Sequence, residues 1–374
     1  MLGGQKAPLL SYIEVSWQRG NVPDMQRLIL LLLVASMGCS GSDSGSSTES
    51  ATTGDDTGGA TTGDDTGGAT TGDDTGTATT GDVSEPGLFA NCPVDKPDFE
   101  FVDVGEVSLR VACQGQGATT LVMLHGFPDF WYGWKGVMAE LSDSFRLIVP
   151  DQRGYNLSDK PAGLEPYQVE HLVADIVGLI SKLGEEKVVL VGHDWGGVVA
   201  WAFGAQHPEL LEKLIILNAP HPQVFARELR DNPDQQQASG YITFFMDENA
   251  EGILSANNYD ALGLAVFNDA FSEEDRSAYR AAWGQPDALT AMLNWYRANV
   301  NDGTLVAENV VIDTLPTLVL WGMKDTALLP GNLVGLEDYI TDLTIQKFEN
   351  ATHWIAHEEP AGVAAAIREF LVSE

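Results

Sequence analysis

The fold of this chain is decided by residues 188–197, which read VVLVGHDWGG. The apolar, β-branched run 188–191 predicts a buried strand that stops at Gly192, and the small residues of 196–205 are compatible with a helix. Asp194 lies at the tip of the sharp turn between this strand and this helix. Taken alone, an aspartate there is equally compatible with a helix cap, so its role depends on the rest of the chain.

A carboxylate at this tip indicates a particular chemistry. In G-x-S-x-G hydrolases, the same strand, turn and helix present a serine, which attacks acyl groups. A carboxylate can instead displace a leaving group from a saturated carbon, and water can later cleave the resulting ester at its carbonyl. Asp194 therefore predicts alkyl transfer to the enzyme followed by hydrolysis.

From residue 100 onward, strand and helix patterns alternate in the manner of a doubly wound α/β sheet. We expect a mostly parallel, eight-stranded sheet flanked by helices, with strands at 100–104, 107–113, 119–124, 146–149, 188–191, 214–217, 317–321 and 343–348. Ligands of such sheets bind beyond the carboxyl ends of the strands. The residues that directly follow each strand are therefore the candidates for a functional site.

Three of these residues, Asp194, Asp325 and His353, follow the chain order nucleophile, acid, histidine of the α/β-hydrolases. An ester on Asp194 persists unless a base activates water, and a histidine held by a buried carboxylate can do so near neutral pH. Alone, Asp325 is compatible with a turn and His353 with a surface loop, but the set predicts a catalytic triad. The backbone N–H groups of Phe127 and Trp195 are the expected oxyanion hole.

Five motifs extend this pattern: HGFP at 125–128, DQRGY at 151–155, GHDWGG at 192–197, NAPHP at 218–222 and LNWYR at 293–297. With them and the late Asp and His, the chain resembles the epoxide hydrolases of the α/β-hydrolase fold over residues 98–372. The resemblance implies a helical cap inserted after the sixth strand, at about 223–301, where the sequence is helix-like and lacks a strand rhythm. It also implies that two cap tyrosines bind the epoxide oxygen.

The matching tyrosines are Tyr241 and Tyr296. Tyr241, Phe244 and Phe245 have the i, i+3, i+4 spacing of one helix face, and Tyr296 belongs to the LNWYR motif. Either face alone is compatible with an ordinary core. An opening epoxide, however, releases an alkoxide, a poor leaving group, so acidic hydroxyls facing Asp194 are what the reaction requires.

The implied activity is hydrolysis of a lipophilic epoxide by water to a vicinal diol, with no metal and no cofactor. Phe244, Phe245 and Trp131 are expected to line an apolar substrate pocket.

A haloalkane or haloacid dehalogenase with the same Asp nucleophile is the first alternative. Such enzymes often carry Asn or Glu at the third position of the HGxP loop, where this chain has Phe127. Some take the triad acid from the end of the sixth strand, where this chain has Asn218, and fluoroacetate-type enzymes follow the nucleophile with Arg rather than Trp195. These departures favour an epoxide. A non-catalytic, surface-displayed binding protein is the second alternative, and it is disfavoured because no catalytic residue is missing.

The beginning of the chain resembles a bacterial lipoprotein precursor. The apolar run 28–35 is too short to span a bilayer, and it leads into SMGC, where Cys39 matches the lipidated cysteine of a lipobox. We expect a signal at 25–39 and an exported protein anchored to the bacterial membrane through a lipid on Cys39. Ser40 after that cysteine favours the outer membrane or cell surface. Residues 1–24 make a poor signal and are interpreted as a misassigned start.

Residues 40–90 predict a disordered acidic linker. They contain ATTGDDTGG repeats with ten acidic and no basic residues, and the repeats lack a large apolar residue that could fill a core. The hydrolase domain is then 91–374. The net charge of the chain, −34, repels phosphate and argues against nucleic acid as a partner. Cys92 and Cys113 are compatible with a disulfide or with two thiols, and both possibilities remain open.

Overall fold

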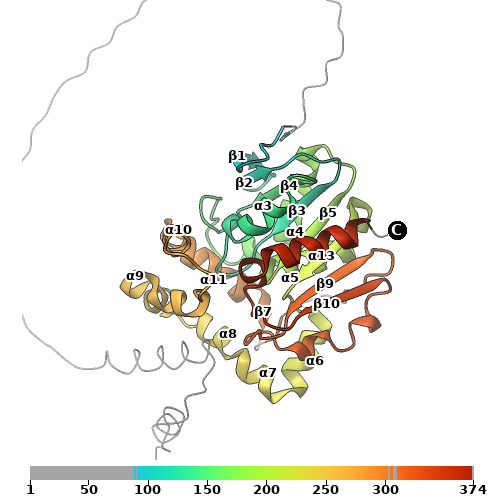
Figure 1. Ribbon diagram of the computed structural model, residues 1–374. Helices are drawn as coiled ribbons and strands as arrows, with labels where there is room; N and C mark the ends of the chain where they lie inside the picture. The colour runs from blue at the N-terminus through green and yellow to red at the C-terminus, as the bar shows by residue number, and fades with distance from the viewer. Residues whose placement is uncertain (1–87, 90, 302–303, 306–309, 373–374) are drawn as a thin grey trace, which may run out of the picture.

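The computed structural model describes residues 88–89, 91–301, 304–305 and 310–372 (Figure 1). The expected start segment 1–24, the signal 25–39 with Cys39, and nearly all of the linker 40–90 lie outside the described residues. Within the described part, no helix combines the length and the apolar character needed to cross a membrane.

An eight-stranded sheet forms the centre of the described molecule, with the strand order β1-β2-β4-β3-β5-β6-β9-β10. Its strands are β1 (Asp98–Asp103), β2 (Ser108–Gln114), β3 (Thr120–Leu124), β4 (Arg146–Pro150), β5 (Val188–His193), β6 (Leu211–Leu217), β9 (Thr317–Gly322) and β10 (Leu343–Phe348). β2 pairs antiparallel with β1 and β4, and all the other neighbours are parallel. The expected α/β fold with eight strands is confirmed.

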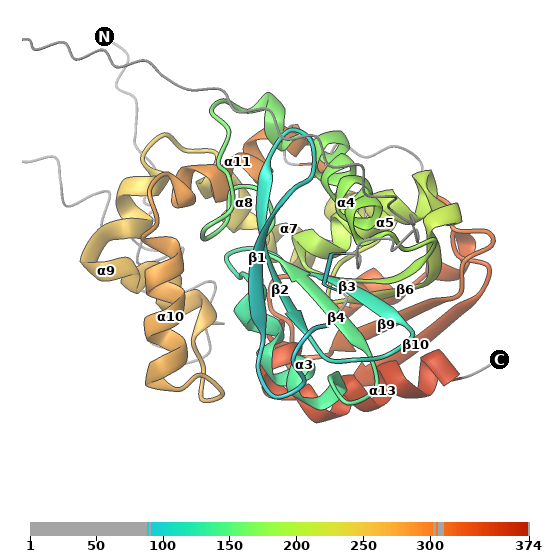
Figure 2. The same cartoon turned by 90° about the horizontal axis from the view of Figure 1, so that it is seen from above.

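Helices cover both faces of this sheet. α3 (Lys135–Leu141) and α13 (Pro360–Val372) pack on one face, and α4 (Val169–Leu183) and α5 (Trp195–Gln206) pack on the other (Figure 2). Because both faces are covered, β3, β5 and β9 are buried along their whole length. This explains why the sequence shows continuous apolar runs there rather than an alternating pattern.

The insertion after β6 is helical. It contains α6 (Pro222–Asp231), α7 (Pro233–Ala238), α8 (Gly240–Phe245), α9 (Ala250–Val266), α10 (Glu273–Trp283) and α11 (Ala288–Asn299). The expected cap had no strands, but β7 (Val300–Asn301) pairs with β8 (Thr304–Leu305) at its end. Helix α9 is also interrupted at 256–259, where Asn257, Asn258 and Tyr259 have positive φ.

Side chains of this cap contact the HGFP loop. The indole N–H of Trp283 donates to the carbonyl of Pro128 at 2.6 Å, and the hydroxyl of Tyr279 donates to the Asp129 carboxylate at 2.6 Å. The cap is therefore tied to the loop that borders the nucleophile.

Cys92 and Cys113 form a disulfide, with Cα atoms 5.5 Å apart. The bond ties the segment before β1 to the end of β2. Of the two possibilities left open by the sequence, a disulfide or two free thiols, the structure shows the disulfide.

Candidate active site

Asp194 occupies a strained turn between β5 and α5. Its φ of 51° and ψ of −122° are unusual for a residue with a side chain. The turn is also tight, because a Cβ on Gly192 would lie 2.4 Å from the carbonyl oxygen of Gly196. Glycine at these positions is what lets the backbone fold back and present the Asp194 carboxylate beyond the sheet.

The loops after β9 and β10 bring Asp325 and His353 to the same edge. The Asp325 Oδ2 atom lies 2.8 Å from His353 Nδ1, and both side chains are buried. The Nε2 atom on the other side of the imidazole lies 3.6 Å from Asp194 Oδ2, which is longer than a hydrogen bond. The three residues are therefore arranged as acid, histidine and nucleophile.

Asn218 supports the triad acid, a role that was not predicted from the sequence. Its side-chain N–H donates to Asp325 Oδ2 at 2.8 Å, and its Oδ1 accepts from the backbone of Gly322 at 2.8 Å. Asn218 is fully buried directly after β6. It therefore holds the acid from the neighbouring strand, and its place after a strand at the ligand-binding edge was the available signal.

Backbone donors reach the nucleophile. The N–H of Phe127 donates to Asp194 Oδ1 at 2.7 Å, and the backbone N–H of Trp195 also contacts this carboxylate. The two oxygens of Asp194 are thus unequal. Oδ1 accepts from the N–H of Phe127, one of the two donors that were expected to form the oxyanion hole, and Oδ2 faces the histidine.

The pKa values of Asp194 and His353 depend on each other's charge. Burial raises the pKa of Asp194, while His353 and the two N–H donors act in the opposite direction. Burial by itself disfavours the imidazolium, but Asp325 and Asp194 outweigh it and raise the pKa of His353 to about 9. In the resting protein, His353 is therefore an imidazolium between two carboxylates.

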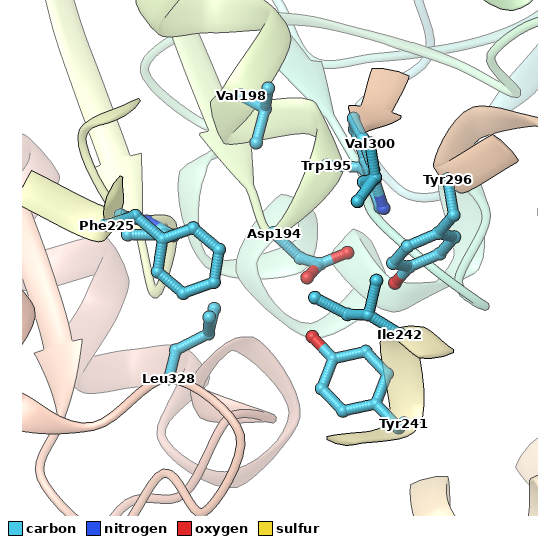
Figure 3. A pocket seen from close by; sticks show the side chains of 10 residues that line it. Asp194, Trp195, Val198, Phe225, Tyr241, Ile242, Tyr296, Val300 and Leu328 are labelled. Atoms are coloured by element: carbon cyan, nitrogen blue, oxygen red, sulfur yellow. The ribbon is translucent and has the colours of Figure 1, made fainter. Parts of the chain in front are cut away.

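Two cavities meet at Asp194, and they share Tyr241 and Tyr296. The first, here called the α6 arm, encloses about 370 Å³ of space, part of it open to solvent, and is further lined by Trp195, Val198, Pro220, Phe225, Ile242, Val300 and Leu328 (Figure 3). The second, here called the α9 arm, encloses about 430 Å³ of space, part of it open to solvent, and is further lined by Phe127, Pro128, Phe245, Leu262, Ala265, Val266, Ala327, His353 and Trp354. Apart from the catalytic residues and the tyrosines, both linings are apolar.

The two tyrosines come from different cap helices, Tyr241 from α8 and Tyr296 from α11. Their rings lie 6.3 Å apart, and both hydroxyls point toward the Asp194 carboxylate in Figure 3. Burial raises the pKa of both hydroxyls, so both keep their protons at neutral pH. They are placed to donate hydrogen bonds to an oxygen bound above Asp194.

The expected pocket residues divide into two groups. Phe245 lines the α9 arm, whereas Trp131 and Phe244 line neither of these two cavities. Trp131 begins the short helix η1 (Trp131–Trp134), and its ring packs 4.8 Å from Phe99 of β1. Phe244 is half-buried on α8 and packs against Phe245.

No group of three or more His, Cys, Asp or Glu side chains that could hold a metal ion occurs among the residues that the structure describes.

Comparisons with known proteins agree with this geometry. A family model described as the α/β hydrolase fold matches residues 119–360. The AB hydrolase superfamily protein YfhM of Bacillus subtilis is 44% identical over 74% of this chain and 98% of its own length. Epoxide hydrolase 1 of Caenorhabditis elegans is 34% identical over 73% of this chain and 70% of its own.

Solved structures show the same likeness. A Bacillus megaterium epoxide hydrolase in complex with an inhibitor has a TM-score of 0.70 and 33% identity, covering 73% of this chain and 100% of its own. A mutant of an epoxide hydrolase from that organism, complexed with its product (R)-3-[1]naphthyloxy-propane-1,2-diol, has a TM-score of 0.68 and 33% identity over the same shares. The chain therefore belongs to the α/β-hydrolase superfamily, as an epoxide hydrolase-like member.

Proposed function

We propose that the protein hydrolyses an apolar epoxide to a vicinal diol through an ester on Asp194. The observation that carries this proposal is the position of two buried, protonated tyrosine hydroxyls that face the carboxylate of Asp194. A nucleophile that displaces an alkoxide needs such donors, because the departing oxygen must receive a proton.

The first step opens the ring. The epoxide oxygen accepts hydrogen bonds from Tyr241 and Tyr296, and Asp194 Oδ2 attacks one ring carbon. The bond between that carbon and the epoxide oxygen breaks, and the oxygen takes a proton from a tyrosine. The product of this step is a hydroxyalkyl ester whose carbonyl oxygen, Oδ1, accepts from the N–H of Phe127.

The second step releases the diol. Esterification removes the negative charge of Asp194, so the pKa of His353 falls. The imidazolium proton then passes through solvent to the tyrosinate left by the first step, and the neutral imidazole can act as a base. It takes a proton from water, and the hydroxide attacks the ester carbonyl. The N–H groups of Phe127 and Trp195 stabilise the oxyanion, and the bond from the carbonyl carbon to Oδ2 then breaks. The diol leaves with that oxygen, which takes a proton from the His353 imidazolium, and the carboxylic acid formed on Asp194 returns a proton to the imidazole.

The two arms indicate the substrate. Each begins at Asp194 and the tyrosines, and neither lining contains a lysine or arginine. An epoxide bound between them would direct one carbon into the α6 arm and the other into the α9 arm. We therefore favour uncharged epoxides with an apolar group on each carbon.

A substrate panel tests the proposal. The purified protein is incubated with 1,2-disubstituted epoxides, with styrene oxide and with 1-chloroalkanes, and diol and chloride are measured. We expect diols from the epoxides. Chloride release without diol would assign the protein to the dehalogenases, and no turnover of either class would favour the non-catalytic binding protein.

We also propose that the protein is exported and held at the bacterial outer membrane or surface by a lipid on Cys39. The lipobox-like SMGC and the acidic linker support this, as does the Cys92–Cys113 disulfide, because such bonds persist in oxidising compartments. Labelling cells with a clickable palmitate is the test. Label on the wild type and its loss in Cys39→Ala are expected, and equal labelling of the two would contradict the anchor.

A further inference from the structure

Gln235 of α7 is a fully buried amide, with 0% exposure, at the junction of the cap and the core. Its Nε2 donates to the hydroxyl of Ser239 at 2.9 Å and to the carbonyl of Ala327 at 2.8 Å. Its Oε1 accepts from the backbone N–H of Leu329 and from the side chain of Asn332, both at 2.9 Å. All four hydrogen-bonding positions of the amide are therefore used.

Two of these bonds enclose the loop that presents the triad acid. Asp325 Oδ1 accepts from the N–H groups of Ala327 at 2.8 Å and Leu328 at 2.9 Å. Gln235 holds the carbonyl of Ala327 and the N–H of Leu329, on either side of Leu328. The donors that orient Asp325 are thus fixed from a cap helix about 90 residues earlier in the chain.

A third hydrogen bond of Gln235, to Ser239, reaches α8, the helix that carries Tyr241. Ser239 is the N-cap residue of α8, two positions before Tyr241. One amide therefore connects the backbone that presents Tyr241 with the loop that presents Asp325.

We propose that Gln235 is a positioning residue that aligns the two halves of the site, Tyr241 for ring opening and Asp325 with His353 for ester hydrolysis. This rests on the proposed function. Small displacements of reacting groups are costly in rate, whereas a purely structural amide would affect stability alone.

The test measures the two steps separately in single turnovers, by following formation and decay of the Asp194 ester with intact mass spectrometry. Gln235→Leu is expected to slow both steps by about 10- to 100-fold. In a Tyr241→Phe background its effect on ester formation should be smaller, because Gln235 acts there through Tyr241.

Ser239→Ala separates the two connections, since it removes only the bond toward α8. We expect slower ester formation, by up to about tenfold, with unchanged ester decay. This milder variant also decides the question if Gln235→Leu does not fold, because an unchanged rate of ester formation would overturn the proposal.

Gln114→Leu is the matched control. Gln114 is a buried amide at the end of β2, and its Nε2 donates to the carbonyl of Val94 at 2.8 Å. It should lower the unfolding temperature and leave both rates unchanged. Wild-type rates in Gln235→Leu, or equal losses in Gln114→Leu, would overturn the role of Gln235. Failure of the wild type to form any ester would overturn the proposed function, and this inference with it.

Discussion

The catalytic edge of the sheet and the cap contribute to the same site in different ways. At the sheet edge, Asp194, Asp325 and His353 each lie within a few residues of a strand end, and parallel strand pairing brings these ends to the same edge. In the cap, Tyr241 and Tyr296 come from helices whose positions depend on packing. Short motifs therefore determine the half that carries Asp194, and tertiary contacts determine the half that we propose binds the epoxide oxygen.

The two regions also serve different steps of the proposed reaction. In the proposed mechanism, the cap supplies the proton for ring opening, and the sheet edge supplies the base for ester hydrolysis. Substitutions in the two regions should then affect different steps.

The largest effect is expected at the sheet edge. His353→Gln removes the base, so the ester should form and persist, and steady-state turnover should fall by at least about 10³-fold. Intact mass spectrometry after mixing with an epoxide should show the protein increased by the mass of one substrate. The same variant without substrate is the control, and a variant that turns over without accumulating ester would show that His353 is not the base.

The cap tyrosines come next. Tyr241→Phe and Tyr296→Phe should each slow ester formation by about 10- to 100-fold and leave ester decay nearly unchanged. The matched control is Tyr132→Phe, because that hydroxyl bonds Lys135 and the residue lines neither cavity. Slower ester decay with normal formation would reverse the assignment of the two halves.

The dependence of stability on pH tests the charge of the triad. The pKa of His353 is raised from 6.5 to about 9, so its contribution to stability is full below pH 6.5 and is lost as the pH rises through 9. Unfolding temperatures of the wild type and His353→Gln should therefore approach each other between pH 6.5 and 9. A constant difference across this range would contradict an imidazolium in the resting protein.

A larger side chain in one arm should change which epoxides are hydrolysed and leave the two reaction steps intact. Val198→Phe narrows the α6 arm and Leu262→Phe narrows the α9 arm. Each should lower kcat/KM for epoxides substituted on both carbons by about tenfold and have less effect on terminal epoxides, which need one arm. Equal losses for both classes would mean that the arms do not hold separate substituents.

The smallest effect on activity is expected far from both halves. Replacing Cys92 and Cys113 by serine should lower the free energy of unfolding by about 3 kcal/mol, the value typical of a loop of this length, because their sequence separation is 21. Both reaction rates should stay the same. Denaturant unfolding and single turnovers measure the two quantities, and a loss of activity in the folded variant would connect the disulfide to the site.

The sequence was sufficient to predict the sheet, because continuous apolar runs reveal strands that are covered on both faces. The sequence was less informative about side chains whose direction is set by tertiary packing. Trp131 was expected in the pocket, but η1 turns its ring toward Phe99, and no local pattern indicates that direction. Gln235 was missed because three of its four partners, Ala327, Leu329 and Asn332, lie in a distant segment of the chain.

The central claim is that Asp194 forms a covalent ester, and isotope labelling tests it most directly. The protein, in excess over styrene oxide, reacts once in oxygen-18 water, and mass spectrometry is applied to the diol and to the peptide that contains Asp194. We expect heavy oxygen in the Asp194 carboxylate and none in the diol, because water attacks the ester carbonyl. A labelled diol with an unlabelled peptide would mean that water attacks the epoxide directly, and it would contradict the account.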